Sequence, residues 1–328
     1  MSIVYAYRSL NSFYRESTSG GAFTKIVCDF YAKGGDVVYG VVLNSDLSIK
    51  HERATSVNDC SKFRKSKYVR SDISGVFQMV ENDIKNQLRV LFTGTPCQVH
   101  ALIKYLEHRK IPSTLLFTID IICNGAPAPK IWRDYVKWIE SVMQKRLCYF
   151  DFRKKGDSNN PYLTEAIFDD GTILTDSPKT ACWNRLFLKK LIIPKGCLNC
   201  SFKKEERVSD ITLGDFWGCQ NIFNNKYLKE GVSLVLINSK KGEYLFQPQN
   251  CKDNAIIEEC ADRQYIEYQG NLKGISPKPK NYEQFWDEYK LYGFDYVANK
   301  YADAKFPRSI KYKMRKCYRY LKGLMPSK

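Results

Sequence analysis

The hydrophobic positions in the first part of the chain alternate between two kinds of stretch. Short apolar runs such as 90–92 are typical of buried strands. They are separated by stretches in which apolar residues recur every three or four positions, as in amphipathic helices. Strands that alternate with helices form largely parallel sheets, so this pattern predicts an α/β domain. The predicted strands are 36–43, 49–54, 90–93 and 115–122, and the predicted helices are 22–33, 74–86, 98–107 and 130–143.

From residue 148 onward the pattern changes, and 148–153 and 162–168 alternate between apolar and polar positions as strands do. Asp170-Gly171 favours a hairpin turn, and Asn281 with Gln284 resembles a capping box at the start of a helix. The predicted strands here are 148–153, 162–168, 172–174, 211–213 and 233–237, with a helix at 181–190 and a helical remainder. We therefore predict an α/β fold with a mixed, partly parallel sheet flanked by helices and a helical C-terminal part. The expected domains are 1–240, a helical extension 241–300 and a basic amphipathic tail 301–328.

The positive charge of the chain is concentrated at its C-terminal end. The 328 residues carry a formal net charge of +17, and residues 301–328 contribute nine Lys or Arg against one acid. Apolar residues in this tail, such as Ile310, Met314 and Cys317, follow helical spacing. A basic amphipathic helix either contacts an anionic membrane surface or docks on the protein with a solvated basic face. Nucleic-acid binding is a weaker alternative, because no nucleic-acid-binding module is visible.

The cysteines are interpreted through the expected compartment. No apolar run reaches the roughly 18 residues that span a bilayer, and the first ten residues lack the apolar core of a signal peptide. We expect a cytoplasmic protein, peripheral at the inner membrane face if the tail binds there. Thiols stay reduced in that compartment. The 12 cysteines are therefore expected to be ligands, redox groups or small core residues rather than disulfides.

Four of these cysteines lie in turns. Cys97 and Cys123 each follow a predicted strand of the α/β part. Neighbouring parallel strands end at the same edge of a sheet, so we expect these two thiols to lie together. Cys197 and Cys200 form a CxxC loop flanked by Pro and Gly. Four sulfur ligands bind an iron–sulfur cluster or a tetrahedral zinc ion, and a dithiol pair without metal is the third alternative.

Three further stretches have the chemistry of an anion or cofactor site. Ser19-Gly20-Gly21 opens a predicted helix, where free backbone N–H groups suit a phosphate, and the turn Thr93-Gly94-Thr95 is similar. Lys67-Tyr68 offers a cation for phosphate and a ring for a flavin. The structural alternatives are a helix cap, a tight turn and a solvated basic loop. Asp215 either orients a ligand or caps a turn. No glycine-rich phosphate loop is present, the three histidines share no motif, and no catalytic residue is predicted.

Taken together, these motifs resemble the coenzyme F-420 hydrogenase/dehydrogenase beta-subunit family. They occur in the order found in that family and cover roughly residues 15–240. The matching stretches are Ser19-Gly20-Gly21-Ala22-Phe23, Val38-Tyr39-Gly40, Ser66-Lys67-Tyr68-Val69-Arg70-Ser71-Asp72, Thr93-Gly94-Thr95-Pro96-Cys97-Gln98, Cys123-Asn124-Gly125-Ala126-Pro127, Cys197-x-x-Cys200 and Ser209-Asp210-Ile211-Thr212-Leu213-Gly214-Asp215-Phe216-Trp217-Gly218.

The resemblance implies that 1–240 is a redox domain with a flavin, FAD or else FMN, and a nearby 4Fe-4S cluster. It implies that the cluster ligands are Cys97, Cys123, Cys197 and Cys200. The residues expected to bind the flavin or line its site are Ser19, Gly20, Gly21, Lys67, Tyr68, Thr93, Gly94, Thr95, Gln98, Asn124 and Asp215. The expected function is that of an oxidoreductase that passes electrons between an external donor or partner and a small-molecule substrate.

The sequence departs from the family in two places. Many relatives carry an N-terminal ferredoxin-like segment, CxxCxxCxxxCP, which is absent here, so the expected electron donor is a partner protein, a reduced nucleotide or a deazaflavin. Asn124 stands where the family usually has a His, which puts proton transfer at that position in doubt. Short relatives resemble products of polysaccharide-biosynthesis loci. The alternative function is a zinc-stabilised binding or glycan-modifying protein with a degenerate flavin site.

Overall fold

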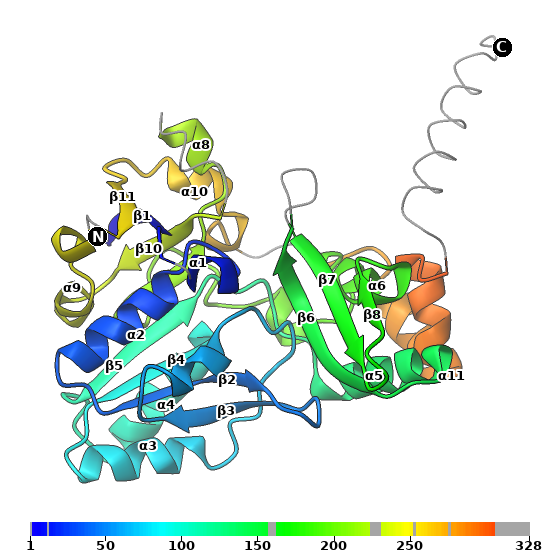
Figure 1. The fold of residues 1–328 in the computed structure, drawn as a ribbon, viewed down its shortest axis with the longest axis horizontal. Helices are drawn as coiled ribbons and strands as arrows, with labels where there is room; N and C mark the ends of the chain where they lie inside the picture. The colour runs from blue at the N-terminus through cyan, green and yellow to red at the C-terminus, as the bar shows by residue number, and fades with distance from the viewer. Residues whose placement is uncertain are drawn as a thin grey trace. The chain divides into compact units, whose positions relative to one another are not determined.

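The computed structural model describes residues 2–11, 13–156, 162–223, 231–251, 254–274 and 277–305 (Figure 1). The chain divides into two compact units, each made of two separate segments. The first unit consists of Met1–Ala126 and Pro194–Pro277, and the second consists of Pro127–Ile193 and Lys278–Lys328. All four cysteines singled out in the sequence belong to the first unit.

The first unit contains an eight-stranded sheet with the order β11-β1-β10-β9-β5-β4-β2-β3. The pairs β2–β4, β4–β5 and β5–β9 are parallel, whereas the outer pairs on both sides are antiparallel. The predicted α/β class with a mixed, partly parallel sheet is thereby confirmed. The strands are β1 (Ile3–Ser9), β2 (Val37–Leu43), β3 (Ile49–Ala54), β4 (Val90–Gly94), β5 (Leu116–Ile121), β9 (Ile211–Asp215), β10 (Ser233–Ile237) and β11 (Ala255–Glu259).

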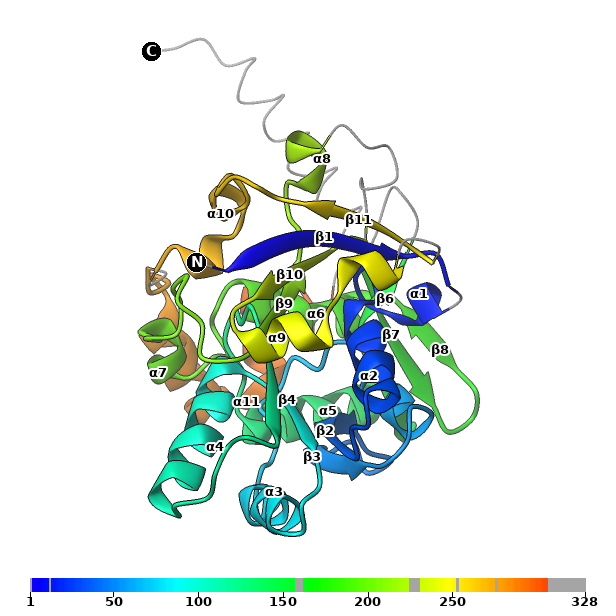
Figure 2. The same cartoon turned by 90° about the vertical axis from the view of Figure 1, so that its left-hand side faces the viewer.

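Helices bury both faces of the parallel part of this sheet. Successive residues of a strand point to opposite faces, and Leu91 packs with residues of α2 and α9, whereas its neighbours Val90 and Phe92 pack with α3 and α4. Figure 2 shows α2 beside α9 and α3 beside α4. The helices of this unit are α1 (Phe13–Glu16), α2 (Ala22–Ala32), η1 (Asp59–Phe63), α3 (Val76–Lys85), α4 (Pro96–His108), α7 (Lys195–Leu198), α8 (Cys219–Ile222), α9 (Lys240–Leu245), η3 (Pro248–Cys251), α10 (Tyr265–Tyr268) and η4 (Gly270–Leu272).

The second unit packs helices on a three-stranded antiparallel sheet with the order β6-β7-β8. Its core is aromatic: the rings of Trp132, Tyr135 and Trp183 lie within 5.0–5.3 Å of one another, centroid to centroid. The elements are α5 (Pro129–Met143), β6 (Leu147–Lys155), β7 (Tyr162–Phe168), β8 (Ile173–Thr175), α6 (Pro178–Leu188) and α11 (Tyr282–Ala302).

The structure corrects two details of the sequence prediction. The C-terminal part is not wholly helical, because Ala255–Glu259 forms strand β11 against β1. Asn281 begins helix α11 without a side-chain capping bond, so the predicted capping box with Gln284 is wrong.

The predicted domain limits follow the linear order of the chain, whereas the two units each combine distant segments. Most of the predicted basic tail, 306–328, lies outside the described residues. No helix in the described part of the chain combines the length and hydrophobicity that crossing a membrane requires.

Candidate functional site

The turn after β4 is locked by its own side chains. Thr95 precedes helix α4, which has Pro96 at its first position, and Thr95 forms a capping box with Gln98. The Thr95 N–H and hydroxyl both donate to Gln98 Oε1, each at 3.0 Å. Cys97 is therefore presented in the first turn of a well-defined helix, exposed to solvent, with its Sγ 3.1 Å from Thr95 Oγ1.

A buried chain of hydrogen bonds connects this turn to β3. Gln98 Nε2 donates to Ser71 Oγ at 2.9 Å, and Ser71 Oγ lies 2.9 Å from His51 Nδ1. His51 Nε2 lies 2.9 Å from the Thr93 carbonyl, an acceptor, so Nε2 carries the proton and Nδ1 accepts from Ser71. Burial lowers the pKa of His51 to about 4, which keeps the ring neutral. Every group in this series of hydrogen bonds has a defined donor or acceptor role.

Cys123 lies just beyond the end of β5, the strand next to β4. Gly125 adopts a left-handed conformation with φ of 109°, and its N–H donates to Cys123 Sγ at 3.3 Å. Burial raises the pKa of the Cys123 thiol to about 12, and the Gly125 N–H partly opposes this rise. The pKa is raised further by the nearby sulfurs of Cys197, Cys97 and Cys200. The structure therefore brings Cys123 within electrostatic range of the three other predicted ligands.

The CxxC loop reaches the same region through contacts of its own. Arg70 Nη2 lies 3.7 Å from Cys197 Sγ. The ring of Phe202 packs on that of His100, one turn beyond Cys97 on α4, at 5.3 Å between centroids. The Cys197 N–H donates to the Pro194 carbonyl at the start of α7. The loop is thus held against the end of the sheet that carries the other two thiols.

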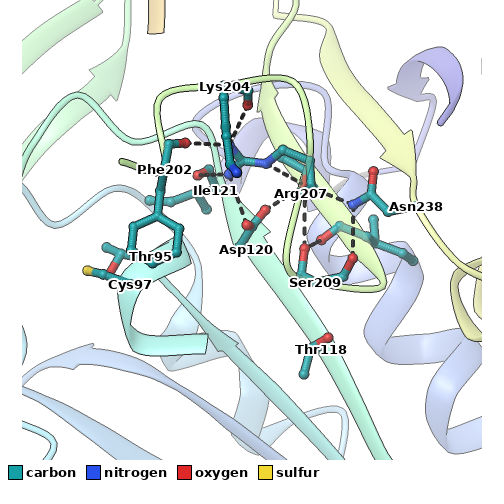
Figure 3. Close-up of polar contacts among 12 residues, drawn as sticks. Thr95, Cys97, Thr118, Asp120, Ile121, Phe202, Lys204, Arg207, Ser209 and Asn238 are labelled. Atoms are coloured by element: carbon teal, nitrogen blue, oxygen red, sulfur yellow. Dashed lines mark hydrogen bonds and ion pairs between the residues drawn. The ribbon is translucent and has the colours of Figure 1, made fainter. Parts of the chain in front are cut away.

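An ion pair that the sequence analysis missed joins this loop to β5 (Figure 3). Arg207 Nη2 lies 2.9 Å from Asp120 Oδ2, and the two side chains are 2% and 0% exposed. All five guanidinium N–H groups have acceptors. They are Asp120 Oδ2, the carbonyls of Ile121, Phe202 and Lys204, and Thr212 Oγ1. Because Phe202 and Lys204 follow Cys200 while Ile121 precedes Cys123, Arg207 connects the two cysteine-bearing segments.

The predicted phosphate-binding stretch at 19–21 is packed against β10. Ser19 Oγ donates to the Val232 carbonyl at 2.8 Å, and the Gly20 N–H donates to Ser233 Oγ at 2.9 Å. A Cβ on Gly20 would lie 2.0 Å from the Tyr7 carbonyl oxygen, so close backbone packing requires glycine here. Gly21, with φ of 89°, precedes α2, which has no side-chain cap and no acid in its first turn. This N-terminus is therefore electrostatically suited to an anion.

Other predicted cofactor contacts have intramolecular partners. The Lys67 ammonium donates to the carbonyls of Lys62, Phe63 and Arg64, so it closes the end of η1. Thr93 Oγ1 donates to the Tyr39 carbonyl at 2.9 Å.

Two of the remaining predicted residues, Gly94 and Asp215, end neighbouring parts of the sheet. Tyr68 and Asn124 are partly buried. Gly94 ends β4, and a Cβ there would lie 3.2–3.4 Å from Phe92 and Gln98. The Asp215 carbonyl at the end of β9 accepts a hydrogen bond from Gln269 Nε2 at 3.0 Å.

The arrangement of the thiols does not match a single-ion site. Within the described residues, no group of three or more His, Cys, Asp or Glu side chains is placed to hold one metal ion. A tetrahedral zinc ion needs its four ligands about 2.0–2.3 Å from one point. In a 4Fe-4S cluster each cysteine binds a different iron, so the sulfurs stand farther apart.

Comparison with known proteins gives a family match and a structural match that cover different parts of the chain. Residues 87–264 match the model of a family described as the C terminus of the beta subunit of coenzyme F420 hydrogenase/dehydrogenase. The fold resembles a chain in the structure of the F420-reducing [NiFe] hydrogenase complex from Methanosarcina barkeri, with a TM-score of 0.57 and 16% sequence identity. That alignment covers 88% of this chain and 92% of the other. No curated protein sequence matches.

Proposed function

The chain belongs to the family of coenzyme F420 hydrogenase/dehydrogenase beta subunits, and from this premise we propose that it is a flavin- and 4Fe-4S-dependent oxidoreductase. The family membership supports a hydrogenase/dehydrogenase-type redox subunit. In this proposal the cluster relays single electrons and the flavin exchanges them in pairs with a small-molecule substrate. A redox partner, a reduced nucleotide or a deazaflavin supplies the electrons.

The observation that carries the proposal is the crowding of thiols around Cys123. Its pKa is raised by burial and by the three sulfurs of the predicted ligand set. In the bare protein the sulfurs of the other three cysteines oppose the ionisation of Cys123. A multivalent cationic centre removes that conflict, since thiolates are its natural ligands.

The surroundings of the sulfurs also suit thiolate ligands. The Gly125 N–H donates to Cys123 Sγ, and Arg70 donates to Cys197 Sγ. Thr95 Oγ1 lies 3.1 Å from Cys97 Sγ, with its own proton donated to Gln98 Oε1. Hydrogen bonds to the cysteine sulfurs are a main determinant of the reduction potential of an iron–sulfur cluster. These residues would therefore hold the cluster ligands and stabilise their negative charge.

The flavin part of the proposal rests on the end of the sheet that carries Cys97 and Cys123. Ligands of open α/β sheets bind at the carboxyl ends of the parallel strands. The turn 93–95 lies at that end of β4, and the N-terminus of α2 is suited to a pyrophosphate. Gln98 and Thr93 would act by fixing the turn, because their side chains bond within the protein.

The test is an absorption spectrum of the full chain purified without oxygen, with iron, sulfide and flavin quantitation. We expect about four iron and four sulfide per chain and one flavin. The variant Cys197→Ser should lose the broad cluster absorbance and most of the iron. The matched control Cys28→Ser, in the partly buried thiol of α2, should retain both.

Two outcomes would contradict the proposal. Wild-type protein without iron and flavin would refute it outright. One zinc per chain and no iron would support the alternative of a zinc-stabilised binding protein.

A further inference from the structure

Arg70 is an exposed residue whose backbone is held in place on both sides. Its neighbours Val69 and Ser71 are 5% and 7% exposed. Ser71 belongs to the hydrogen-bonded chain through His51, and the Asp72 N–H donates to the Ile49 carbonyl of β3 at 2.8 Å. A long flexible side chain on a fixed backbone can place its charged group reproducibly. Here the guanidinium is placed 3.7 Å from Cys197 Sγ.

We propose that Arg70 sets the reduction potential of the redox centre through this contact with the Cys197 sulfur. The inference rests on the proposed function, because it presumes that Cys197 is a cluster ligand. Arg70 is not a catalytic residue, since it acts on the centre through a ligand. It supplies a fixed positive charge and an N–H donor to a sulfur whose negative charge grows on reduction.

The physical effect has a defined sign. A one-electron reduction adds one negative charge to the thiolate-bound centre, and the guanidinium of Arg70 is a cation. A cation close to the sulfur therefore stabilises the reduced state more than the oxidised state. Arg70 raises the midpoint potential. Since the side chain is exposed, salt screens part of this effect.

Three variants of the full chain separate this role from a general effect of charge. Arg70→Gln removes the charge, and Arg70→Lys keeps the charge without the planar donor group. Arg109→Gln makes the same change in net charge at the opposite end of α4, about 18 Å along the helix from Cys97. Arg109 contacts Glu81 rather than a cysteine.

The midpoint potential is measured by anaerobic titration with dithionite, followed by the cluster absorbance and by electron paramagnetic resonance. We expect Arg70→Gln to shift the one-electron equilibrium toward the oxidised state by about tenfold, which corresponds to about 59 mV. Arg70→Lys should give a smaller shift in the same direction, and Arg109→Gln should match wild type. The shift of Arg70→Gln should diminish at 1 M salt, where the Debye length falls to about 3 Å.

The outcomes distinguish this inference from the proposed function. Iron-free wild-type protein contradicts both. If wild type and all variants contain the cluster but Arg70→Gln and Arg109→Gln have the same midpoint potential, the inference is overturned and the proposed function is not. If Arg70→Gln loses its iron, the midpoint potential of Arg70→Lys is the test instead. A midpoint potential of Arg70→Lys equal to that of wild type overturns the inference.

Discussion

Replacing Arg207 with Met should destabilise the first unit by about 3–5 kcal/mol, the range for removing one partner of a buried ion pair. The upper part of that range applies, because the Arg207 and Asp120 side chains are 2% and 0% exposed. The substitution also leaves the carbonyls of Phe202 and Lys204 without their guanidinium partner. Methionine retains most of the apolar stem, so the main loss is electrostatic rather than one of packing.

The loss of stability caused by Arg207→Met should depend on pH. Burial raises the pKa of Asp120 despite the neighbouring Arg207, which lowers it. Without Arg207 the pKa of Asp120 rises further, so this carboxyl group is protonated over a wider pH range. A protonated, neutral Asp120 is tolerated in the core better than an unpaired carboxylate. The destabilisation by Arg207→Met should therefore be smaller at pH 5 than at pH 8.

The assay is urea unfolding followed by circular dichroism, with hydrogen exchange of the peptide 116–122 to report on the first unit alone. The double variant Asp120→Asn with Arg207→Met should recover part of the stability, with an interaction energy of about 2–3 kcal/mol. The matched control is Arg263→Met, whose partner Glu205 lies in the same loop region and whose side chain is 60% exposed. It should lose no more than about 1 kcal/mol. Equal losses for Arg207→Met and Arg263→Met, or a loss independent of pH, would refute the reasoning.

Two further predictions concern His51 and Gly20. Burial lowers the pKa of His51 from 6.5 to about 4, so the unfolded chain binds its proton first. The stabilisation from neutral His51 should be complete above about pH 6.5, and the free energy of unfolding should fall by up to about 3 kcal/mol toward pH 4. The variant His51→Gln should lose this dependence of the unfolding free energy on pH, as measured by urea unfolding. An equal pH dependence in the variant and wild type would contradict the prediction. Gly20→Ala should cost about 1–3 kcal/mol, because the new Cβ would lie 2.0 Å from the Tyr7 carbonyl oxygen. Gly270→Ala, where nothing lies within 4 Å, should be nearly neutral, and equal unfolding midpoints for the two variants would refute the steric argument.

The central strands of the sheet can be predicted from the sequence because each one is a short apolar run within a few residues. The runs around 90–94 and 116–121 are apolar and bounded by turn residues. The edge strand β11 resembles a helical segment in sequence, because two glutamates follow Ala255, Ile256 and Ile257. Its strand conformation is imposed by pairing with β1, whose partner residues lie some 250 positions away in the chain. Tertiary pairing of this kind overrides weak local preference.

The two-unit organisation is not accessible from linear order. The chain leaves the first unit at Ala126 and returns at Pro194. Local sequence patterns do not indicate that the strand at 211–215 pairs with the strand at 116–121 in one sheet. The predicted limit near residue 240 marks the end of the family motifs. The structural limits mark the residues at which the chain passes from one compact unit to the other.

Part of the candidate site follows from topology, and part does not. Cys97 and Cys123 can be paired from the sequence because parallel strands end at one edge of the sheet. Arg207 and Asp120 cannot, since 87 positions separate them and charged residues are expected at the surface unless they are paired. His51 has no role that its local sequence reveals, because its partners Ser71 and Thr93 lie on two other segments.

The contacts around the thiols are made by the protein alone. The chain through His51 fixes the turn that bears Cys97, and the ion pair of Arg207 fixes the segments next to Cys123 and Cys200. Small zinc domains differ, because they fold only when their metal binds. If these contacts hold the proposed ligand positions without metal, the metal content and the stability of the first unit should be separable. That separation is why a cysteine variant that loses iron and an Arg207 variant that loses stability test two different parts of the same site.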